Sequence, residues 1–440
     1  MIVDTKLELE ALFQYIQNRK ILLVPILADS QCHASVNNIS CIYVYTEDQV
    51  ERIVPIRHTE QIIGFSEELQ QFLDLTDIFV YDKKQWLQMG GNAAVWDVKT
   101  LWWYTYNESY DETHYYTPAH QFYWRRHTAL PNVNTLIPLM QHLAMCQKIR
   151  KYAWPMCANA KLTTSYLQFN SIYPAVFAAI EKVGLQVTDT FKLPDLVKAS
   201  KVYTNYNYHT TTGRPSNAFR GFNYAAMNKE DGTREAFVTR FESGALVEMD
   251  FDAYHVRLIA RLIGYSLPAG SVHEYFGKFY FDTTELTAEQ YEQSKQITFR
   301  LLYGGIDKEF LEIPFFKQVN DFIYDLWRQW KAKHHVKTPI LQRKITNESV
   351  QNMTANKLFN YYLQATETEV SVQKLLAVQT MLRDRETCII LYTYDSILLD
   401  VPIHEAKDVI PAIKSVIETG NFPVKVQLGN NYNKMNTITL

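Results

Sequence analysis

The sequence predicts an α/β fold divided into two or three domains. The first ~130 residues alternate short strand-like runs with helical stretches, and two hairpin-like segments follow at 237–264 and 387–401. A chain of 440 residues is also too long for one compact core. We therefore expect at least two modules, each with its own sheet.

The N-terminal region contains three strand-like runs, at 21–28, 38–47 and 51–58. They are rich in β-branched and aromatic residues and are bounded by turn residues, and the first two have the character of paired strands. A helical stretch from 67 to 75 follows them. This order predicts an α/β module at the start of the chain.

Helical periodicity dominates the next part of the chain. Apolar residues recur at helical spacing between Val133 and Trp154, and the stretch 166–184 continues in the same style. The segment from Leu185 to Thr212 is polar and rich in tyrosine. We expect two connecting helices, followed by a loop with little core.

The composition excludes several classes of protein. Five cysteines, an odd number, are scattered without CxxC spacing, which predicts reduced thiols rather than a disulfide framework or a zinc site. The N-terminus lacks the features of a signal peptide, and no apolar segment is long enough to span a bilayer. We therefore expect a soluble cytoplasmic protein without a membrane partner.

The net charge of -3 argues weakly against nucleic-acid binding, because such proteins usually present a basic surface to phosphates. Acidic side chains elsewhere can hide a basic groove, however, and the segment 328–344 is locally rich in cations. The charge alone therefore does not exclude a nucleic-acid partner.

Two aspartates stand where strands end. The segment 237–264 has the pattern of a hairpin whose second strand runs into a helix, which leaves Asp250 at the strand end, and Asp395 lies at the turn of the hairpin 387–401. Two carboxylates from distant parts of a chain can bridge the two divalent cations that phosphoryl transfer requires. Taken singly, either residue is more typical of an ordinary turn aspartate than of a metal ligand.

One predicted helix carries a cation and two aromatic rings in a row. A capping box at 287–290 opens it and two glycines at 304–305 end it. Lys295, Phe299 and Tyr303 are spaced at i, i+4 and i+8, on one face. Such a row would hold a triphosphate, a deoxyribose and a nascent base pair. The alternative is an apolar core stripe, but a core stripe disfavours a lysine in line with the aromatics.

Five segments resemble, in order, motifs of the family A DNA polymerases. KQITFRLLYG (295–304) is similar to the family motif of lysine, three residues, phenylalanine or tyrosine, three residues and Tyr-Gly. DFDAYHVR (250–257) resembles DYSQIELR, and YDS (394–396) resembles HDE. TGRPSN (212–217) is similar to TGRLSS, and FNYYLQAT (359–366) to INAPMQGT. Five ordered matches are far more specific than any single pattern.

The resemblance, which covers the chain from Tyr166 onward, implies an α/β (α+β) architecture of a compact, phage-like member of the family. An N-terminal ribonuclease-H-like exonuclease fold would precede a polymerase palm with an antiparallel sheet and helical fingers. The implied domains are a degenerate 3′–5′ exonuclease-like domain at 1–145, connecting helices with a reduced thumb at 146–212, and palm and fingers at 213–440. The fingers would occupy about 265–375.

The resemblance also implies a set of site residues. The catalytic carboxylates and metal ligands would be Asp250 and Asp395, with the backbone carbonyl of Phe251, and they would hold two Mg²⁺ ions, for which Mn²⁺ could substitute. The nucleotide-binding residues would be Lys295, Phe299, Tyr303, His255, His273 and Tyr291. The DNA-binding residues would be Arg214, Asn360, Gln364 and Tyr394.

Individual roles follow from the same resemblance. Lys295 would contact the triphosphate, Phe299 would stack on the incoming nucleotide, Tyr303 would pack beside the templating position, and His273 would lie near the phosphates. Arg214, with two polar residues at 360 and 364, would contact the minor groove, where all correct base pairs present similar acceptors.

Four positions depart from the family pattern. His255 replaces a glutamate that blocks a 2′-hydroxyl, which puts sugar discrimination in question. Tyr291 and Asn356 replace arginines, and Ser396 replaces the glutamate of HDE. We expect each change to weaken binding or rate without removing the two carboxylates.

The thumb and the editing site are the larger departures. Only about 28 residues, 185–212, stand where the family has two long helices, too few at 1.5 Å rise per residue. We expect low processivity unless a replisome partner supplies a clamp. The four carboxylate positions of the exonuclease fall on apolar residues, and two nearby aspartates do not rebuild the set: Ile26, Ala28, Trp86 and Val133, with Asp29 and Asp82 beside them.

The sequence therefore predicts a DNA-directed DNA polymerase that adds dNTPs to a primer–template in replication or repair, without proofreading, in a host cytoplasm if it is phage-encoded. Two alternatives remain open. His255 motivates a polymerase with relaxed sugar or template choice, similar to an RNA polymerase. A non-catalytic polymerase-like scaffold is the other, although it would have no need of two positioned carboxylates. A nuclease is disfavoured because the N-terminal acids are missing.

Overall fold

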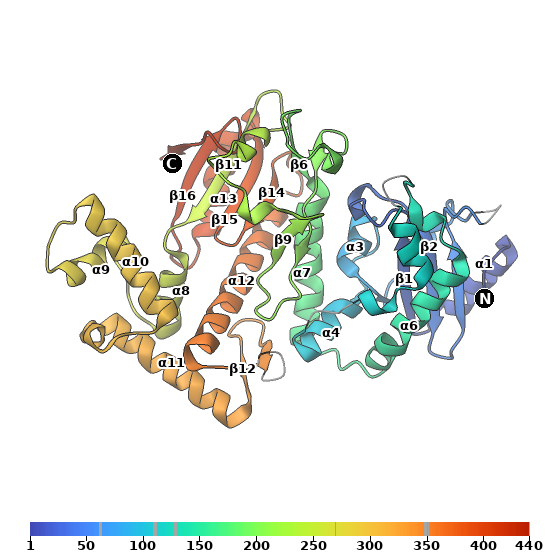
Figure 1. Ribbon diagram of the computed structural model, residues 1–440, viewed down its shortest axis with the longest axis horizontal. Helices are drawn as coiled ribbons and strands as arrows, with labels where there is room; N and C mark the ends of the chain where they lie inside the picture. The colour runs from blue at the N-terminus through green and yellow to red at the C-terminus, as the bar shows by residue number, and fades with distance from the viewer. Residues whose placement is uncertain are drawn as a thin grey trace.

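The computed structural model describes residues 1–60, 64–108, 112–126, 130–268, 270–346, 350 and 352–439. These residues form two five-stranded sheets that are separate in the molecule. Helix α7 (Thr164–Val183) runs between them, and the helices of residues 254–333 extend away from the N-terminal sheet, beyond the long helix α12 (Ala355–Met381) (Figure 1). The chain is therefore built from an N-terminal α/β domain and a larger C-terminal α/β unit.

The N-terminal sheet has the strand order β3-β2-β1-β4-β5. The first three strands are antiparallel, whereas β4 and β5 run parallel to β1. This mixed topology agrees with the predicted ribonuclease-H-like fold, and the three predicted strands are confirmed. The strands are β1 (Ile21–Leu27), β2 (Ile39–Thr46), β3 (Glu51–Pro55), β4 (Phe79–Val80) and β5 (Trp96–Asp97).

The central strand β1 buries both of its faces, which explains its continuous apolar sequence. Leu22 and Val24 pack in the cluster that α6 (Leu139–Ala158) covers, whereas Ile21 and Leu23 pack in the cluster on the other face, with α1. Helix α6 confirms the helix predicted between Val133 and Trp154. It packs against this sheet and extends beyond residue 145, the predicted end of the N-terminal domain. The other helices of this region are α1 (Lys6–Ile16), α2 (Leu69–Leu73), α3 (Lys83–Gln88), α4 (Val98–Tyr106) and α5 (Pro118–Trp124).

A buried carboxylate joins the two parts of the molecule. Glu181, on α7, accepts from Lys84 Nζ of α3 at 2.7 Å and from the backbone N–H of Tyr206 at 2.5 Å. Gln88 donates to the same carboxylate. Glu181 is fully buried, so these groups replace the water that its charge would otherwise require. We call this set the Glu181 joint.

The C-terminal sheet has the order β14-β15-β11-β16-β17 and is antiparallel throughout. The predicted hairpin at 387–401 is confirmed, with a two-residue turn at Tyr394 and Asp395. The strands are β11 (Gly244–Phe251), β14 (Cys388–Thr393), β15 (Ser396–Pro402), β16 (Val424–Gly429) and β17 (Asn436–Ile438).

The predicted hairpin at 237–264 is half wrong. Strand β11 does run into a helix, but its partners are β15 and β16, and Val238 forms only an isolated bridge with Asn431. The local pattern could not reveal this, because β11 lies in the middle of the sheet and both neighbours come from the far end of the chain.

The prediction of little core at 185–212 is also wrong. Val202, Tyr206 and Tyr208 are buried there, because a tyrosine ring can be buried when its hydroxyl finds a partner, and Tyr206 Oη donates to the carbonyl of Tyr392 at 3.1 Å. The short strands of the C-terminal unit are β6 (Leu185–Gln186), β7 (Lys201–Val202), β8 (Tyr206–Asn207), β9 (Ser216–Phe219), β10 (Phe222–Asn223), β12 (His335–Lys337) and β13 (Lys344–Thr346).

The remaining helices surround the C-terminal sheet and α12. The capping box predicted at 287–290 is present at the start of α10, and Gly304 is the last residue of that helix. These helices are α8 (Tyr254–Ile263), α9 (Val272–Phe281), α10 (Ala288–Gly304), α11 (Pro314–Lys333) and α13 (Ile403–Glu418). Within the described residues, no helix combines the length and the apolar character that crossing a bilayer demands.

We predict that Glu181→Ala lowers the free energy of unfolding by about 3–5 kcal/mol, because it leaves the Lys84 ammonium buried without its carboxylate. Urea unfolding followed by circular dichroism measures this change. The matched control is Lys317→Ala, which removes an exposed ion pair with Asp321 and should cost less than about 1 kcal/mol. A Glu181→Ala midpoint equal to that of the control would contradict the role of the joint.

Candidate active site

The β-ladder brings the two predicted aspartates to neighbouring strand ends. Asp250 lies opposite Ser396 in the pairing of β11 with β15, so Asp395 directly precedes its partner. The backbone N–H of Phe251 donates to the carbonyl of Asp395 at 2.9 Å. Tyr394 adopts a left-handed conformation, with φ of 59°, which makes the tight turn possible. The two carboxylates are therefore held by backbone geometry rather than by flexible loops.

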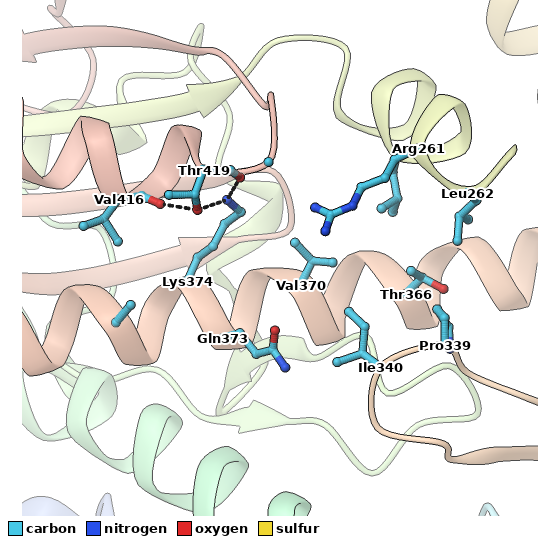
Figure 2. A pocket seen from close by; sticks show the side chains of 13 residues that line it. Arg261, Leu262, Pro339, Ile340, Thr366, Val370, Gln373, Lys374, Val416 and Thr419 are labelled. Carbon is cyan, nitrogen blue, oxygen red and sulfur yellow. Dashed lines mark hydrogen bonds between the residues drawn. The ribbon is translucent and has the colours of Figure 1, made fainter. Parts of the chain in front are cut away.

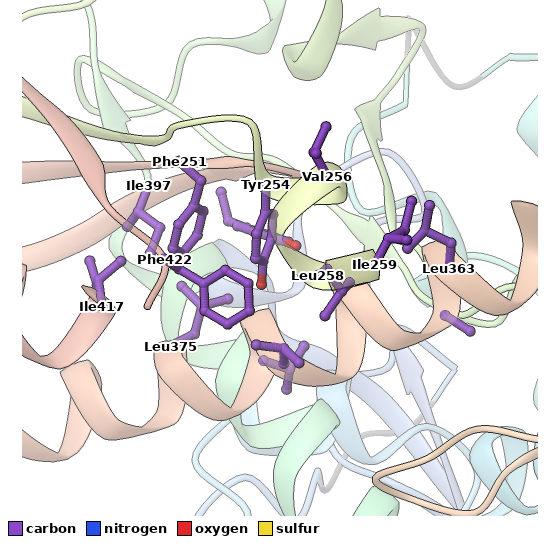
Figure 3. Packing of buried hydrophobic residues seen from close by; sticks show 14 of the residues in the cluster. Phe251, Tyr254, Val256, Leu258, Ile259, Leu363, Leu375, Ile397, Ile417 and Phe422 are labelled. Carbon is purple, nitrogen blue, oxygen red and sulfur yellow. The ribbon is translucent and has the colours of Figure 1, made fainter. Parts of the chain in front are cut away.

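Aromatic packing anchors this edge of the sheet (Figure 3). The ring of Phe251 stacks on that of Tyr254, with centroids 4.2 Å apart, and Tyr254 meets Phe422 edge to face at 5.2 Å. The hydroxyl of Tyr254 also hydrogen-bonds to that of Ser371 on α12 at 3.0 Å. The strand that carries Asp250 is thus fixed to the first turn of α8 and to α12.

A cavity of about 450 Å³ opens beside the two aspartates. Most of the predicted site residues line it: Arg214, Asp250, Phe251, His255, His273, Tyr291, Lys295, Phe299, Tyr303, Gln364 and Asp395. Asn360 and Tyr394 do not line it but touch residues that do. Asn360 Nδ2 donates to the carbonyl of Tyr303 at 3.2 Å, and the Arg214 guanidinium lies 3.8 Å above the ring of Tyr394.

Burial and neighbouring carboxylates destabilise the ionised form of both aspartates. Burial, the charge of Asp395 and the charge of Glu248 raise the pKa of Asp250 to about 7. Burial and the charge of Glu367 raise the pKa of Asp395 as well. A divalent cation would remove this repulsion, because it stabilises both carboxylates in their charged form. The pair therefore has the chemistry of a metal site.

The carboxylates do not form a closed metal cage. No group of three or more His, Cys, Asp or Glu side chains within the described ranges is arranged to hold a metal ion. A cation bound by Asp250 and Asp395 would keep other positions open for backbone oxygens, water or a substrate, as Mg²⁺ sites commonly do.

Helix α10 forms the opposite wall of the cavity. The rings of Phe299 and Tyr303 stack with centroids 6.1 Å apart, and His273 of α9 lies 5.8 Å from Phe299 and 6.0 Å from Tyr291. Burial lowers the pKa of His273, so this imidazole is neutral near pH 7. With Lys295 on the same wall, the cavity offers a cation and flat apolar surfaces to a ligand.

Sequence reasoning missed Glu367, which also lines the cavity. This side chain is 1% exposed, and its Oε2 lies 2.9 Å from His255 Nε2 and 3.3 Å from Arg214 Nε. Helical spacing could have found it, because Glu367 follows Gln364 by three residues and Asn360 by seven, on one face of α12. Asp252, Ala253, Tyr254 and Lys425 complete the lining.

Two of the departures from the family pattern have local structural roles. Asn356 Nδ2 donates to the carbonyl of Gly304, at the end of α10, at 3.2 Å. Ser396 Oγ lies 2.6 Å from the hydroxyl of Thr393 and 3.4 Å from Glu248. Both residues therefore support the elements around the cavity without lining it.

The N-terminal domain presents a different picture. The four residues predicted to stand at or near the carboxylate positions of an exonuclease are buried apolar side chains, Ile26, Ala28, Trp86 and Val133. Asp82 accepts from the N–H of Gln85 at the start of α3 and pairs with Lys99 Nζ at 3.0 Å, which lowers its pKa despite burial. Asp29 accepts from the N–H groups of Gln31 and Asn132. Both aspartates are thus already engaged by protein groups.

A larger cavity, of about 670 Å³, lies between α8, α12 and α13 and contains none of the predicted site residues (Figure 2). Its lining is mostly apolar, with Arg261 and Lys374 as its charged groups. Lys374 Nζ donates to the carbonyl of Thr419 at 2.7 Å and to that of Ile417, at the C-terminal end of α13, where the helix dipole favours a cation. The smaller cavity is the candidate active site because it contains the two aspartates, Lys295 and the stacked rings, although the other cavity is larger.

No protein-family model matches the chain. DNA polymerase I of Lactococcus lactis subsp. cremoris (strain MG1363) is 21% identical over 262 residues, which cover 51% of this chain and 30% of that protein. The matched region is thus less than a third of that relative's length.

Similarity of structure extends over the whole chain. The POL domain of Pol1 from M. smegmatis, solved in complex with DNA primer-template and dNTP, aligns with a TM-score of 0.68 at 14% sequence identity. The alignment covers 98% of this chain and 99% of that one. The chain therefore has the fold of a family A DNA polymerase domain and distant sequence similarity to DNA polymerase I, which confirms the resemblance predicted from its motifs.

We predict that the free energy of unfolding of the metal-free protein falls as the pH rises, and that it falls less in Asp395→Asn than in the wild type. The carboxyl of Asp250, with a pKa raised from 3.8 to about 7, takes up a proton on folding, so its stabilising contribution disappears as the pH rises through that interval. Removing the Asp395 charge lowers this pKa. Urea unfolding in a chelator at about pH 5 and about pH 8 measures the difference.

The control for this experiment is Asp321→Asn, at an exposed position on α11, a helix that does not line the cavity. It should leave the difference between the two pH values unchanged. A difference in Asp395→Asn as large as that of the wild type would show that the two carboxylates do not interact.

Proposed function

We propose that the protein is a DNA-directed DNA polymerase, which adds dNTPs to the 3′ end of a primer by two-metal-ion phosphoryl transfer. The observation that carries this proposal is the meeting of Asp250 and Asp395 at adjacent strand ends, in one cavity with Lys295 and Phe299. Phosphoryl transfer depends on positioning and on stabilising charge, and this cavity offers both anchored carboxylates and a cation.

Two Mg²⁺ ions, or Mn²⁺ in their place, would be held by Asp250 and Asp395 with the backbone carbonyl of Phe251. The pKa of Asp250, raised by burial and then by the charge of Asp395, supports this proposal, because a bound cation would stabilise the ionised carboxylate. Bound metal ions would supply a more acidic 3′-hydroxyl and stabilise the charge on the phosphates.

The incoming nucleotide would lie along α10. Lys295 would contact its triphosphate, Phe299 would stack on its base, and Tyr303 would pack beside the templating position. The parallel rings of Phe299 and Tyr303 favour this arrangement, since a flat apolar surface suits a base. The neutral His273 and Tyr291 would lie on the triphosphate side of the same wall.

The primer–template duplex would occupy the side of the cavity formed by Arg214 and Gln364, with Asn360 and Tyr394 next to them. The stacking of the Arg214 guanidinium on Tyr394 orients the donor that would reach minor-groove acceptors. The similar domain from M. smegmatis was solved with primer-template and dNTP, which supports the same pair of ligands here.

The N-terminal region, predicted at 1–145, would not proofread. Editing of this kind requires carboxylates that hold two metal ions, and the corresponding positions are apolar here. Its aspartates at 29 and 82 are occupied by protein donors. We propose that this domain has a structural role through the Glu181 joint.

Two alternative functions, a polymerase with relaxed sugar choice and a non-catalytic scaffold, differ from this one in what they would do with nucleotides. His255 in place of a glutamate favours a polymerase with relaxed sugar choice, for which incorporation of rNTPs would be the sign. A non-catalytic scaffold would have no reason to keep Asp250 and Asp395 buried against their repulsion, because such carboxylates cost stability.

We predict that the wild type extends a primed DNA template with Mg²⁺ and dNTPs, and that Asp250→Ala and Asp395→Ala each lose at least about 10²–10³-fold in rate, as when essential charge stabilisation is removed. Primer extension resolved on denaturing gels measures this. Asp321→Asn is the control and should extend like the wild type. Full activity in either alanine variant, or none in the wild type, would contradict the proposed function.

We predict low processivity for the isolated chain, because residues 185–212 form short strands and a 3₁₀ turn in place of long helices that could grip duplex DNA. Extension with excess unlabelled primer–template as a trap should yield products of a few nucleotides per binding event. A long product ladder under the trap would contradict this prediction. A replisome protein that lengthens the products would be the proposed processivity partner.

A further inference from the structure

Glu367 is a nearly fully buried carboxylate that no motif comparison assigned to the site. Its two close polar neighbours, His255 on α8 and Arg214 in the segment before β9, come from different parts of the chain. Because an ionised carboxylate is costly to bury, its position between two cationic or polar partners needs an explanation beyond packing.

Both nitrogens of the His255 ring are engaged. Nδ1 contacts the hydroxyl of Tyr303, and Nε2 lies 2.9 Å from Glu367 Oε2. In the described part of the chain neither Nε2 nor Oε2 makes a well-aligned hydrogen bond, to each other or to another group, so the two atoms interact chiefly by electrostatic attraction at 2.9 Å. The ring is thus held at both ends, from α10 and from α12.

The protons follow from the acidity of the phenol. Burial and the charge of Glu367 raise the pKa of Tyr303 to about 12, so its hydroxyl keeps its proton and can donate to Nδ1. An imidazole that accepts at Nδ1 carries its proton on Nε2, toward the carboxylate of Glu367. Glu367 therefore favours one tautomer and one orientation of the His255 ring.

The His255 ring stands where a sugar would lie. It follows Asp250 at the start of α8, and it contacts Tyr303, the last member of the row that begins at Lys295. A nucleotide would have its phosphates near Asp250 and Lys295 and its base on Phe299. Its sugar, which joins the phosphates to the base, would then lie beside the imidazole of His255. An additional hydroxyl on that sugar would then compete with the ring for space.

We propose that Glu367 is a positioning residue that fixes His255, and that selection of deoxyribose over ribose depends on it. This inference rests on the proposed function. Without the carboxylate, only the Tyr303 hydroxyl holds the ring, which can then turn and make room for a 2′-hydroxyl. Glu367 itself touches no substrate, and its effect reaches the sugar through His255.

The contact with Arg214 is separable from this effect. The Arg214 guanidinium stacks on Tyr394 and lies on the side of the proposed duplex, so its release would change primer–template binding for both kinds of nucleotide alike. The ratio of kcat/KM for a dNTP to kcat/KM for the matching rNTP cancels such a change. This ratio therefore reports on the sugar site alone.

Single-nucleotide insertion on a primed DNA template, with dTTP and UTP opposite adenine and dCTP and CTP opposite guanine, tests the proposal. Glu367→Ala should reduce the dNTP-to-rNTP ratio at least about 10-fold, mainly by lowering KM for the rNTP. Glu367→Gln keeps a carbonyl oxygen that can accept from His255 Nε2, so it should retain the ratio within about 3-fold.

A double-mutant cycle shows whether Glu367 acts through His255. The ratio of Glu367→Ala with His255→Ala should equal that of His255→Ala alone, because the positioning residue has nothing left to position. Tyr303→Phe removes the other contact of the ring and should lower the ratio in the same direction. It supplies the test should Glu367→Ala fail to fold.

The matched control is Glu369→Gln, on the same helix and as buried as Glu367, whose carboxylate accepts from the backbone N–H of Leu341. It should leave the ratio unchanged. A ratio within about 2-fold of the wild type in Glu367→Ala, or independent effects in the cycle, would overturn the proposal. Loss of all insertion in the wild type would instead refute the proposed function.

Discussion

The candidate site depends on two like charges that the main chain forces together. Asp250 and Asp395 would separate if they stood on loops, but the ladder between β11 and β15 and the turn at Tyr394 fix their backbones. β11 is paired on both sides, with β16 as its second neighbour, and its end is packed against aromatic rings. The pairing and packing of the C-terminal sheet thus offset the free energy that is lost when the two carboxylates are held close together.

The charges around this pair are arranged across several elements. α12 contributes Glu367, the segment before β9 contributes Arg214, and α8 contributes His255, while α10 forms the facing wall. The glutamate of the family motif at the start of α8 is replaced by His255. A carboxylate from α12, that of Glu367, lies against the imidazole of His255 instead. The total charge of the cavity is therefore set by residues that no single motif contains.

Local chemistry explains what the sequence could and could not predict. The capping box of α10, the turn at Asp395 and the strands of the N-terminal sheet have short-range signals, and all three appear as predicted. The partners of β11 and the buried tyrosines of 185–212 depend on contacts between distant segments, which periodicity does not record. Helical spacing places Glu367 on the face of Gln364 and Asn360, but its contacts with His255 and Arg214 join distant segments and appear only in the structure.

The Glu181 joint has a consequence for how this molecule can be divided. Its carboxylate belongs to the C-terminal unit, whereas Lys84 and Gln88 belong to the N-terminal domain. If the chain were cut between these parts, one fragment would keep Lys84 and the other Glu181. Each charge would lose its partner and would lie on a surface that is buried in the intact protein. The two units are therefore expected to fold and to persist as one structural module, because neither can be removed without exposing a buried charge of the other.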